Sequence, residues 1–347
     1  MNPRIGVIFS QLRSTLQFSD SPILHTSLYM PKTILVTGSA GFIGFHISKA
    51  LLERGDNVIG IDNFNTYYNP QLKEDRNNAL NKYRGYKLYR ADIKDKHIID
   101  QIFRNEPIDV ICHLAAQAGA RYSIEHPGEY IQSNIEGTVN IFEAARTHKV
   151  QDIIFASSSS VYGNNPVPWS ESQEVNMPIN PYGATKRASE LLAYTYHHLY
   201  GLNMTMLRFF TVYGPWGRPD MAYFKWANAI AKDQPIDVYN NGKMKRDFTY
   251  VEDIVQGALA AIDNPKPYEI YNLGNHRAEE IGAMIKLIEQ NLGKEAKKNL
   301  LPMQPGDFLE NFADISKAKK DLGFEPKTSL EHGIKKFVEW YKDYYKI

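Results

Sequence analysis

The sequence ILVTGSAGFIG at residues 34–44 decides the fold of this 347-residue chain. Its first four residues are apolar or β-branched and predict a short buried strand, and residues 45–54 predict a helix. The glycines Gly38, Gly41 and Gly44 lie between the two. Glycine lets the backbone turn sharply and approach a pyrophosphate, whose charge then meets the helix N-terminus. This stretch therefore predicts the first strand, the phosphate-binding loop and the first helix of a nucleotide-binding domain.

More short apolar runs follow, separated by segments with helical spacing. Strands are predicted at 57–61, 86–89, 110–113, 152–156 and 204–208, and the main helices at 98–105, 130–148 and 182–200. Strands that alternate with helices form a parallel sheet covered on both faces. The predicted fold class is therefore α/β, with a Rossmann doubly wound parallel sheet in a domain at residues 31–210.

The pattern changes after about residue 210. Glycine and proline become denser at 214–219, and helices predicted around 222–232, 252–262 and 278–292 alternate with short strands. We expect residues 211–347 to form mainly a smaller C-terminal α/β substrate domain, with an interleaved boundary. In such folds this domain closes over the carboxyl edge of the sheet, where ligands bind.

The bulk composition is that of an ordinary globular protein, with 43% hydrophobic and 23% charged residues. The net charge of +1 gives no reason to expect nucleic acid or an anionic membrane as a partner, and no run of about 18 apolar residues predicts a membrane helix. The single cysteine, Cys112, cannot form an internal disulfide, so we expect a buried core residue in a reducing, cytoplasmic compartment. For residues 1–30 we expect a disordered extension or a start codon assigned too early.

The residue after the second predicted strand points to the cofactor. Asp62 can accept hydrogen bonds from both hydroxyls of an adenosine ribose. The segment Asp62-Asn63-Phe64 carries no arginine or lysine to hold a 2′-phosphate, which the carboxylate would repel. These residues predict NAD rather than NADP.

Other polar or small residues lie at the same predicted sheet edge. Asp92 and Ile93 suit the adenine amine, although loop chemistry alone also explains them, and Asn134 either fixes a neighbouring helix or lies at the surface. The predicted cofactor-binding residues are Gly38, Gly41, Phe42, Ile43, Gly44, Asp62, Asn63, Asp92, Ile93, Leu114, Ala115, Ala116, Gln117, Asn134, Ser157, Tyr182 and Lys186.

Tyr182 and Lys186 lie four residues apart and share one face of a predicted helix. A phenol with a pKa near 10 is a poor base at neutral pH, but an adjacent ammonium and a positive nicotinamide could lower that pKa by about 3 units. The same spacing occurs at Tyr83/Lys87 and Tyr239/Lys243. Only the pair at 182 and 186 follows a strand that ends in four serines, 157–160, whose hydroxyls can bond a reacting sugar oxygen.

Together these motifs resemble the extended short-chain dehydrogenase/reductases, and within them the UDP-glucuronate 4-epimerases. The resemblance runs from about residue 32 to the C-terminus, and its most specific segments are 37–44, 113–122, 156–163, 208–221, 237–253 and 301–307. It implies that Tyr182 is the acid/base, that Lys186 binds the nicotinamide ribose and that Ser158 bonds the C4 oxygen. It also implies a UDP-sugar substrate and a homodimer.

Local chemistry separates the relatives. The sugar 4,6-dehydratases carry an Asp-Glu pair where this chain has Ser159-Ser160, and UDP-glucuronate decarboxylases typically carry glutamate at the position of Ser160. The run TVYGPWGR at 211–218 resembles the glucuronate epimerases. UDP-glucose/UDP-galactose 4-epimerase, UDP-glucuronate decarboxylase and a non-catalytic NAD-sensing scaffold stay open as alternatives.

A 4-keto sugar acid loses carbon dioxide when its carboxylate bond lies perpendicular to the carbonyl plane, so we expect hydrogen bonds to hold that group in place. The predicted substrate-binding residues are Ser158, Ser159, Ser160, Thr211, Arg218, Arg246 and Asp307. Ser159, Ser160, Thr211 and Arg218 would hold the carboxylate, although Arg218 could also serve a diphosphate or a surface ion pair. Arg246 would meet the diphosphate unless it is solvated, and Asp307 the uridine. The residues after Asp307 depart from the pattern of the relatives.

Overall fold

The computed structural model describes residues 30–303 and 309–347. Residues 31–347 form one compact unit by their contacts. The expectation for the first thirty residues falls, apart from the exposed Met30, outside the described residues. The predicted uridine contact at Asp307 lies outside them as well.

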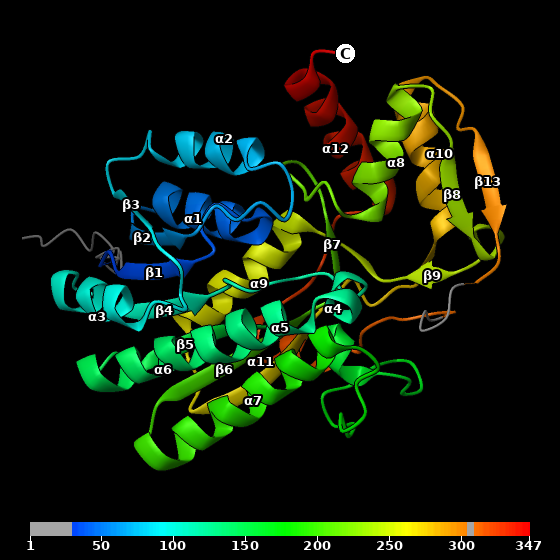
Figure 1. Ribbon diagram of the computed structural model, residues 1–347. Coiled ribbons are helices and arrows are strands. Elements are labelled where there is room, and N and C mark those ends of the chain that lie inside the picture. Colours follow the sequence, from blue (N-terminus) through cyan, green and yellow to red (C-terminus); the bar gives the residue numbers. More distant parts are fainter. Residues whose placement is uncertain (1–29, 304–308) are drawn as a thin grey trace, which may run out of the picture. The chain divides into compact units, whose positions relative to one another are not determined.

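A parallel sheet of seven strands forms the centre of this unit (Figure 1). The order across the sheet is β11-β6-β5-β4-β1-β2-β3. The strands are β1 (Thr33–Thr37), β2 (Asn57–Asp62), β3 (Tyr86–Arg90), β4 (Val110–His113), β5 (Asp152–Ser158), β6 (Asn203–Phe209) and β11 (Tyr268–Leu273). The predicted Rossmann doubly wound sheet is confirmed. Its edge strand β11 comes from the part of the chain after residue 210.

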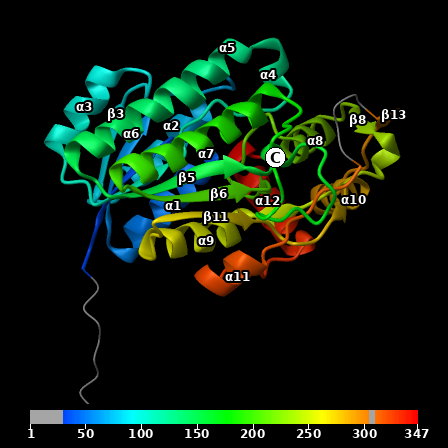
Figure 2. The same cartoon turned by 90° about the horizontal axis from the view of Figure 1, so that it is seen from below.

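Helices cover both faces of the sheet, and Figure 2 shows them on either side of the strands. One face carries α3 (Lys96–Asn105), α6 (Gly137–His148) and α7 (Pro181–Tyr200), and the other carries α1 (Phe42–Arg54), α9 (Val251–Asp263) and α11 (Ser316–Leu322). A separate buried apolar cluster fills each interface. Because both faces are covered, the central strand β1 contains a continuous buried apolar run, Ile34-Leu35-Val36.

The chain reverses its direction of travel across the sheet at β1. This strand pairs with β2 on one side and with β4 on the other. The carboxyl ends of β1 and β4 therefore diverge into loops that run to opposite sides. In open α/β sheets this is the position of the ligand crevice.

A third buried apolar cluster lies in the C-terminal part, at the upper right of Figure 1. Its main elements are α8 (Ala222–Ala231), α10 (Ile281–Leu292), α12 (Leu330–Tyr345) and the parallel pair β8 (Ile236–Tyr239) and β13 (Lys298–Leu301). Two small pairs join this part to the main sheet edge, β7 (Thr211–Tyr213) with β10 (Phe248–Tyr250) and β9 (Lys245–Arg246) with β12 (Glu279–Glu280). The helices α2 (Gln71–Leu80), α4 (Tyr122–Glu125) and α5 (Pro127–Tyr130) lie in the first half.

The predicted helix at 130–148 differs from the structure. It contains a π-helical turn, η1 (Ile131–Glu136), before α6 begins at Gly137. Such turns often occur at functional sites, because the widened turn redirects side chains. Within the described ranges, no helix is long and apolar enough to cross a membrane.

Candidate active site

A cavity of about 250 Å³ opens at the carboxyl ends of β1, β2, β4 and β5. Most of the predicted site residues lie on its wall. Those that line it are Gly38, Gly41, Phe42, Ile43, Gly44, Asp62, Asn63, Ile93, Leu114, Ala115, Ala116, Gln117, Ser157, Ser158, Tyr182, Lys186 and Arg218. Residues from segments up to about 180 positions apart are thus brought to one site.

The glycine loop is shaped by close backbone contacts. Gly38 has a positive φ of 72°, and its N–H donates to Ile61 O at 2.6 Å. A Cβ on Gly44 would lie well inside van der Waals contact with the carbonyl of Gly38. Gly41 caps α1 with no side-chain hydrogen bond, so the first N–H groups of the helix are left for a ligand. This loop fits the pyrophosphate of a dinucleotide.

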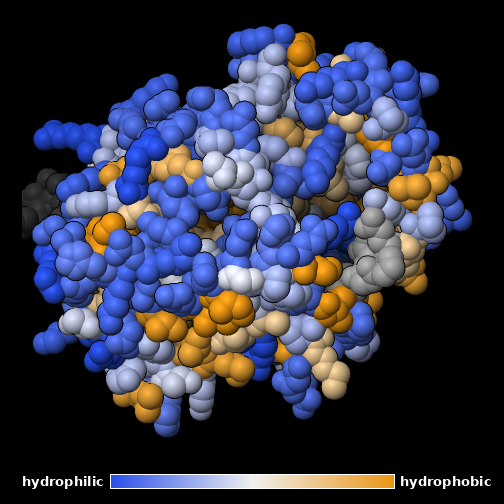
Figure 3. Space-filling model, viewed as in Figure 1, coloured by the Kyte–Doolittle hydropathy of each residue, from blue (hydrophilic) through white to orange (hydrophobic). Residues whose placement is uncertain are grey.

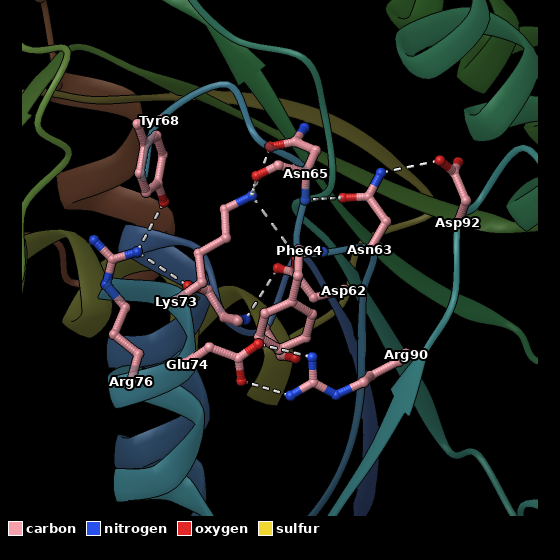
Figure 4. Close-up of polar contacts among 12 residues, drawn as sticks. Asp62, Asn63, Phe64, Asn65, Tyr68, Lys73, Glu74, Arg76, Arg90 and Asp92 are labelled. Carbon is pink, nitrogen blue, oxygen red and sulfur yellow. Dashed lines mark hydrogen bonds and ion pairs between the residues drawn. The ribbon is translucent and has the colours of Figure 1, made fainter. Parts of the chain in front are cut away.

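Asp62 at the end of β2 is held by two backbone N–H groups, as Figure 4 shows. Its carboxylate accepts from Ala40 N at 3.2 Å and from Phe64 N at 2.8 Å. Lys73 of α2 lies 4.0 Å from the same carboxylate and donates to the Asn65 side chain at 2.7 Å. The prediction considered only the residues next to Asp62 in sequence and missed this lysine.

Two predicted cofactor residues lie behind the wall of the cavity rather than on it. Asp92 accepts from Asn63 Nδ2 at 2.9 Å and so holds an amide that does line the cavity. Asn134, in the π-helical turn, accepts from Gln117 N at 2.8 Å and donates to Thr185 Oγ1 at 3.0 Å. Of its two interpretations, the geometry matches the one in which it fixes the helix of Tyr182.

Gln117 supplies an observation that bears on a ligand. Its side chain is 5% exposed, and its Nε2 forms no hydrogen bond of good geometry with the described residues, although the amide interacts with the Tyr130 hydroxyl. A buried donor without an acceptor costs about 1–3 kcal/mol. Because Gln117 lines the cavity, an acceptor on a bound ligand would remove that cost.

Tyr182 lies in the first turn of α7, which Asn180 caps by accepting from Gly183 N at 2.8 Å. Its hydroxyl shares a hydrogen bond with Ser158. Burial raises the pKa of Tyr182, and the bond to Ser158 and the charge of Arg218 oppose that rise. The chain's own groups therefore favour a protonated phenol at this position.

Lys186 is 2% exposed and donates from Nζ to Ala156 O at 2.8 Å. Burial lowers the pKa of Lys186 to about 7, against an opposing effect of Glu190. The sequence led us to expect this ammonium to help lower the pKa of Tyr182. In the structure burial instead raises the pKa of Tyr182, and the cation that opposes this rise is Arg218.

The four serines at residues 157–160 span the end of β5 and the start of the following turn. Ser157 Oγ donates to the buried Glu190 at 2.6 Å, and Ser158 Oγ accepts from Ser160 N at 3.2 Å. Ser159 and Ser160 begin a 3-10 turn and do not line the cavity. Thr211 does not line it either. Their assignment to a sugar carboxylate stays a prediction.

Arg218 reaches the cavity from the loop after β7. Its Nε and Nη2 donate to the two carboxylate oxygens of Asp220 at 3.0 and 2.5 Å. Asp220 also accepts from Tyr67 OH at 3.3 Å. The pair leaves Nη1 of Arg218 for a ligand. Arg246 donates to Lys245 O at 2.8 Å and does not line this cavity.

The wall also contains residues that the sequence did not single out. They are Ile61, Asn65, Tyr67, Tyr68, Lys73, Ala91, Ala118, Ser133, Ala156, Phe209, Phe210, Val212 and Met221. The run NTYYN at 65–69, directly after Asp62, was the one available signal, because two neighbouring tyrosines in a loop at a ligand edge are unusual for a surface turn.

Comparison with known proteins agrees with this geometry. A family model described as the NAD dependent epimerase/dehydratase family matches residues 34–274. An uncharacterised protein of Methanocaldococcus jannaschii is 53% identical over 89% of this chain and 96% of its own length. UDP-glucuronate 4-epimerase 4 of Arabidopsis thaliana is 46% identical over 93% of this chain and 78% of its own.

Among solved structures, UDP-glucuronic acid 4-epimerase from Bacillus cereus in complex with UDP-glucuronic acid and NAD is similar, with a TM-score of 0.85. The two chains are 36% identical, and the match covers 90% of this chain and 100% of the other.

Proposed function

Because this chain belongs to the NAD dependent epimerase/dehydratase family, we propose that it interconverts UDP-glucuronate and UDP-galacturonate by inverting C4 of the sugar. The observation that carries the substrate is the position of Arg218, whose guanidinium lines the same cavity as Tyr182 and Ser158. A sugar with an acid group at C5 gives this cation a partner, and a neutral hexose does not.

The cofactor is NAD, and the residues that would hold it fit its parts. The glycine loop at 38–44 would take the pyrophosphate, Asp62 the adenosine ribose, and Lys186 the nicotinamide ribose. When bound, NAD supplies the redox chemistry, because it takes a hydride from C4 and returns it to the opposite face.

Tyr182 is the group placed to move the proton at the C4 oxygen. As phenolate it takes the proton during oxidation, and as phenol it gives the proton back during reduction. Ser158, already bonded to that hydroxyl, would bond the same sugar oxygen and keep it within reach. The 4-keto sugar must turn over between the two half-reactions to present its other face.

The acid group of this 4-keto sugar has to be restrained. We assign that role to Arg218 and, in line with the prediction, to Ser159, Ser160 and Thr211. Arg218 would use Nη1, because Asp220 occupies its other edge. Holding the carboxylate close to the carbonyl plane keeps the C5–carboxylate bond from breaking.

Product analysis with purified enzyme tests the function. UDP-glucuronate should give UDP-galacturonate on ion-exchange chromatography, with much slower turnover of UDP-glucose. Turnover of UDP-glucose alone would make the chain a UDP-glucose 4-epimerase instead. A pentose and carbon dioxide as main products would make it a decarboxylase, and no turnover with retained NAD would leave the scaffold interpretation.

We also propose that the protein is a homodimer in the cytoplasm. Large apolar side chains are exposed along α7, namely Leu191, Tyr194 and Leu199 with 54%, 52% and 60% exposure, and Ile131 of η1 lies exposed beside them. Figure 3 shows apolar surface over the region where α7 lies in Figure 1. A second copy of these helices would cover it.

Light scattering of the purified protein measures its mass and so tests the proposed dimer directly. The buried free thiol of Cys112 suits a reducing compartment.

A further inference from the structure

Arg76 is a buried cation that the proposed mechanism does not use. It lies on α2, is 0% exposed and makes five hydrogen bonds. Every acceptor is a neutral oxygen, and no carboxylate of the described residues forms an ion pair with it. A buried charge without a counter-charge is costly, and an apolar side chain of similar size would usually be better for stability alone. The charge at this position therefore indicates a role other than stabilising the fold.

The bonds of Arg76 join two loops that both contribute residues to the cavity wall. On the cofactor side, Nη1 donates to Ala40 O of the glycine loop at 3.0 Å and to Tyr68 OH at 2.9 Å. Figure 4 shows Arg76 directed at Tyr68 from its helix. On the sugar side, Nη2 donates to Trp216 O at 2.5 Å and to Gly217 O at 2.9 Å. The residue that follows Gly217 is Arg218.

The loop that carries Arg218 has no regular structure of its own to hold it. Trp216 adopts a positive φ of 58°, a conformation that a non-glycine residue keeps only when its surroundings impose it. The imposing contacts come from α1 and α2, where His46 Nε2 donates to Pro215 O at 2.9 Å and Arg76 binds the next two carbonyls. These three consecutive carbonyls fix the direction in which Arg218 leaves the backbone.

We propose that Arg76 is a positioning residue for Arg218, which it aims at the sugar acid by clamping carbonyls 216 and 217 to the glycine loop. The proposal rests on the proposed function and names a new residue for it. Without the clamp, Arg218 keeps its pairing with Asp220 but loses its fixed approach to the cavity. Binding of substrates with an acid group is then weakened, and binding of neutral UDP-sugars is not.

When Arg218 no longer holds the sugar carboxylate, a defined side reaction follows. Oxidation transfers a hydride from C4 to NAD and gives a β-keto acid. If the C5–carboxylate bond then breaks, carbon dioxide leaves, the electron pair stays on C5 as an enolate, and C5 takes a proton. The products are carbon dioxide, a UDP-4-keto-pentose and NADH. The keto-pentose keeps its C4 ketone, so NADH is left over when this sugar dissociates before the hydride returns to C4. Each such event therefore leaves one reduced cofactor, which absorbs at about 340 nm.

The experiment compares Arg76→Met and Arg76→Lys with wild type and with Arg90→Met as the matched control. Arg90 also binds α2, through both oxygens of Glu74 at 2.8 and 2.5 Å, but touches neither loop. Calorimetry on the holoenzyme measures Kd for UDP-glucuronate and for UDP-glucose. Chromatography and absorbance measure the fraction of UDP-glucuronate that ends as keto-pentose with NADH.

Relative to UDP-glucose, Arg76→Met should bind UDP-glucuronate roughly tenfold more weakly than wild type does. It should also accumulate NADH with UDP-glucuronate. Arg90→Met should match wild type in both measurements. Arg76→Lys, which keeps the charge but cannot bind both carbonyls and Ala40 in one plane, should fall between them. An unchanged Kd ratio and product partition in Arg76→Met would overturn the proposal. So would an equal effect of Arg90→Met, or unfolding of both Arg76 variants, because Arg76 would then serve the fold. Wild type that makes no UDP-galacturonate would instead refute the proposed function.

Discussion

The two sides of the cavity are built in different ways. On the cofactor side, the ligand-facing groups are the backbone of residues 38–44 and side chains placed directly at the ends of β2, β4 and β5. On the sugar side, Arg218 sits on an irregular loop that His46 and Arg76 hold from other helices. Strand ends in a parallel sheet are fixed by the hydrogen bonds of the whole sheet, whereas a loop is fixed only by the particular side chains that reach it.

This difference predicts which substitutions each side of the cavity tolerates. The cofactor side should fail through backbone clashes and should be insensitive to distant side chains. The sugar side should fail through the loss of single side-chain contacts, with little loss of overall stability. Four predictions test this contrast.

The largest effect is expected at Tyr182, where the two sides meet. Tyr182→Phe should lower kcat by about 10³-fold or more, because it removes the only group of the proposed mechanism that moves the C4 proton. NAD affinity should stay within about twofold, since the hydroxyl bonds Ser158 and no part of the glycine loop. Turnover that survives this change would remove Tyr182 from the mechanism.

Gly44→Ala tests the backbone-built side. The new methyl group would press on the carbonyl of Gly38, so the loop must shift, and we expect a loss of about 3 kcal/mol of unfolding free energy together with weaker NAD binding. Gly128→Ala is the control, because a Cβ there would meet nothing within 4 Å. Equal denaturation midpoints for the two variants would contradict this account of the loop.

One buried histidine lies on each side, and both should make stability fall in acid. Burial lowers the pKa of His113 to about 3 and that of His46 to about 4. The folded chain therefore keeps them neutral, while the unfolded chain takes up protons below about pH 6.5. Their contribution is complete above that pH and is lost as the pH falls toward the folded pKa.

Between pH 7 and pH 5 each of these histidines should cost about 2 kcal/mol of unfolding free energy. His113→Gln should flatten the dependence by that amount, as measured by urea unfolding at the two pH values. His332→Gln, at an exposed position, should leave the slope as it is. A slope that His113→Gln does not change would show that this site is not kept neutral.

The smallest effect is expected on the sugar side at Asp220. Asp220→Asn should leave Arg218 charged but less well oriented, so we expect kcat/KM for UDP-glucuronate to fall about tenfold while kcat/KM for UDP-glucose is unchanged. Asp233→Asn breaks an exposed ion pair with Lys294 and serves as the control. An equal fall for UDP-glucose would mean that Asp220 does not act through the acid group of the sugar.

The fold could be predicted because its signals are local. The predicted strand at 34–37 is β1 (Thr33–Thr37), and that at 204–208 is β6 (Asn203–Phe209). Each is a short apolar run between turns, and both faces of the sheet are buried. The π-helical turn at Ile131–Glu136 could not be predicted, because it depends on the contacts of Asn134 with Gln117 and Thr185.

The site could be predicted on one side only. Asp62 and Ser158 directly end their strands, so their position follows from the order of elements. Arg76 bonds Trp216, which is 140 residues away in sequence, and no sequence pattern near either residue predicts this contact. Ser159 and Ser160 lie in a 3-10 turn and not in the strand, so their position does not follow from the order of elements.

The aromatic surroundings of Trp216 have a practical consequence. Its indole packs against Phe45, Trp340 and Tyr344, with ring centroids 5.4, 5.4 and 5.5 Å apart, while its own carbonyl is held by Arg76. The chain has only four tryptophans, so this one contributes to a small set of indole emitters. The enzyme thus carries an optical reporter on the loop of Arg218, and ligand titrations could follow that loop without any attached dye.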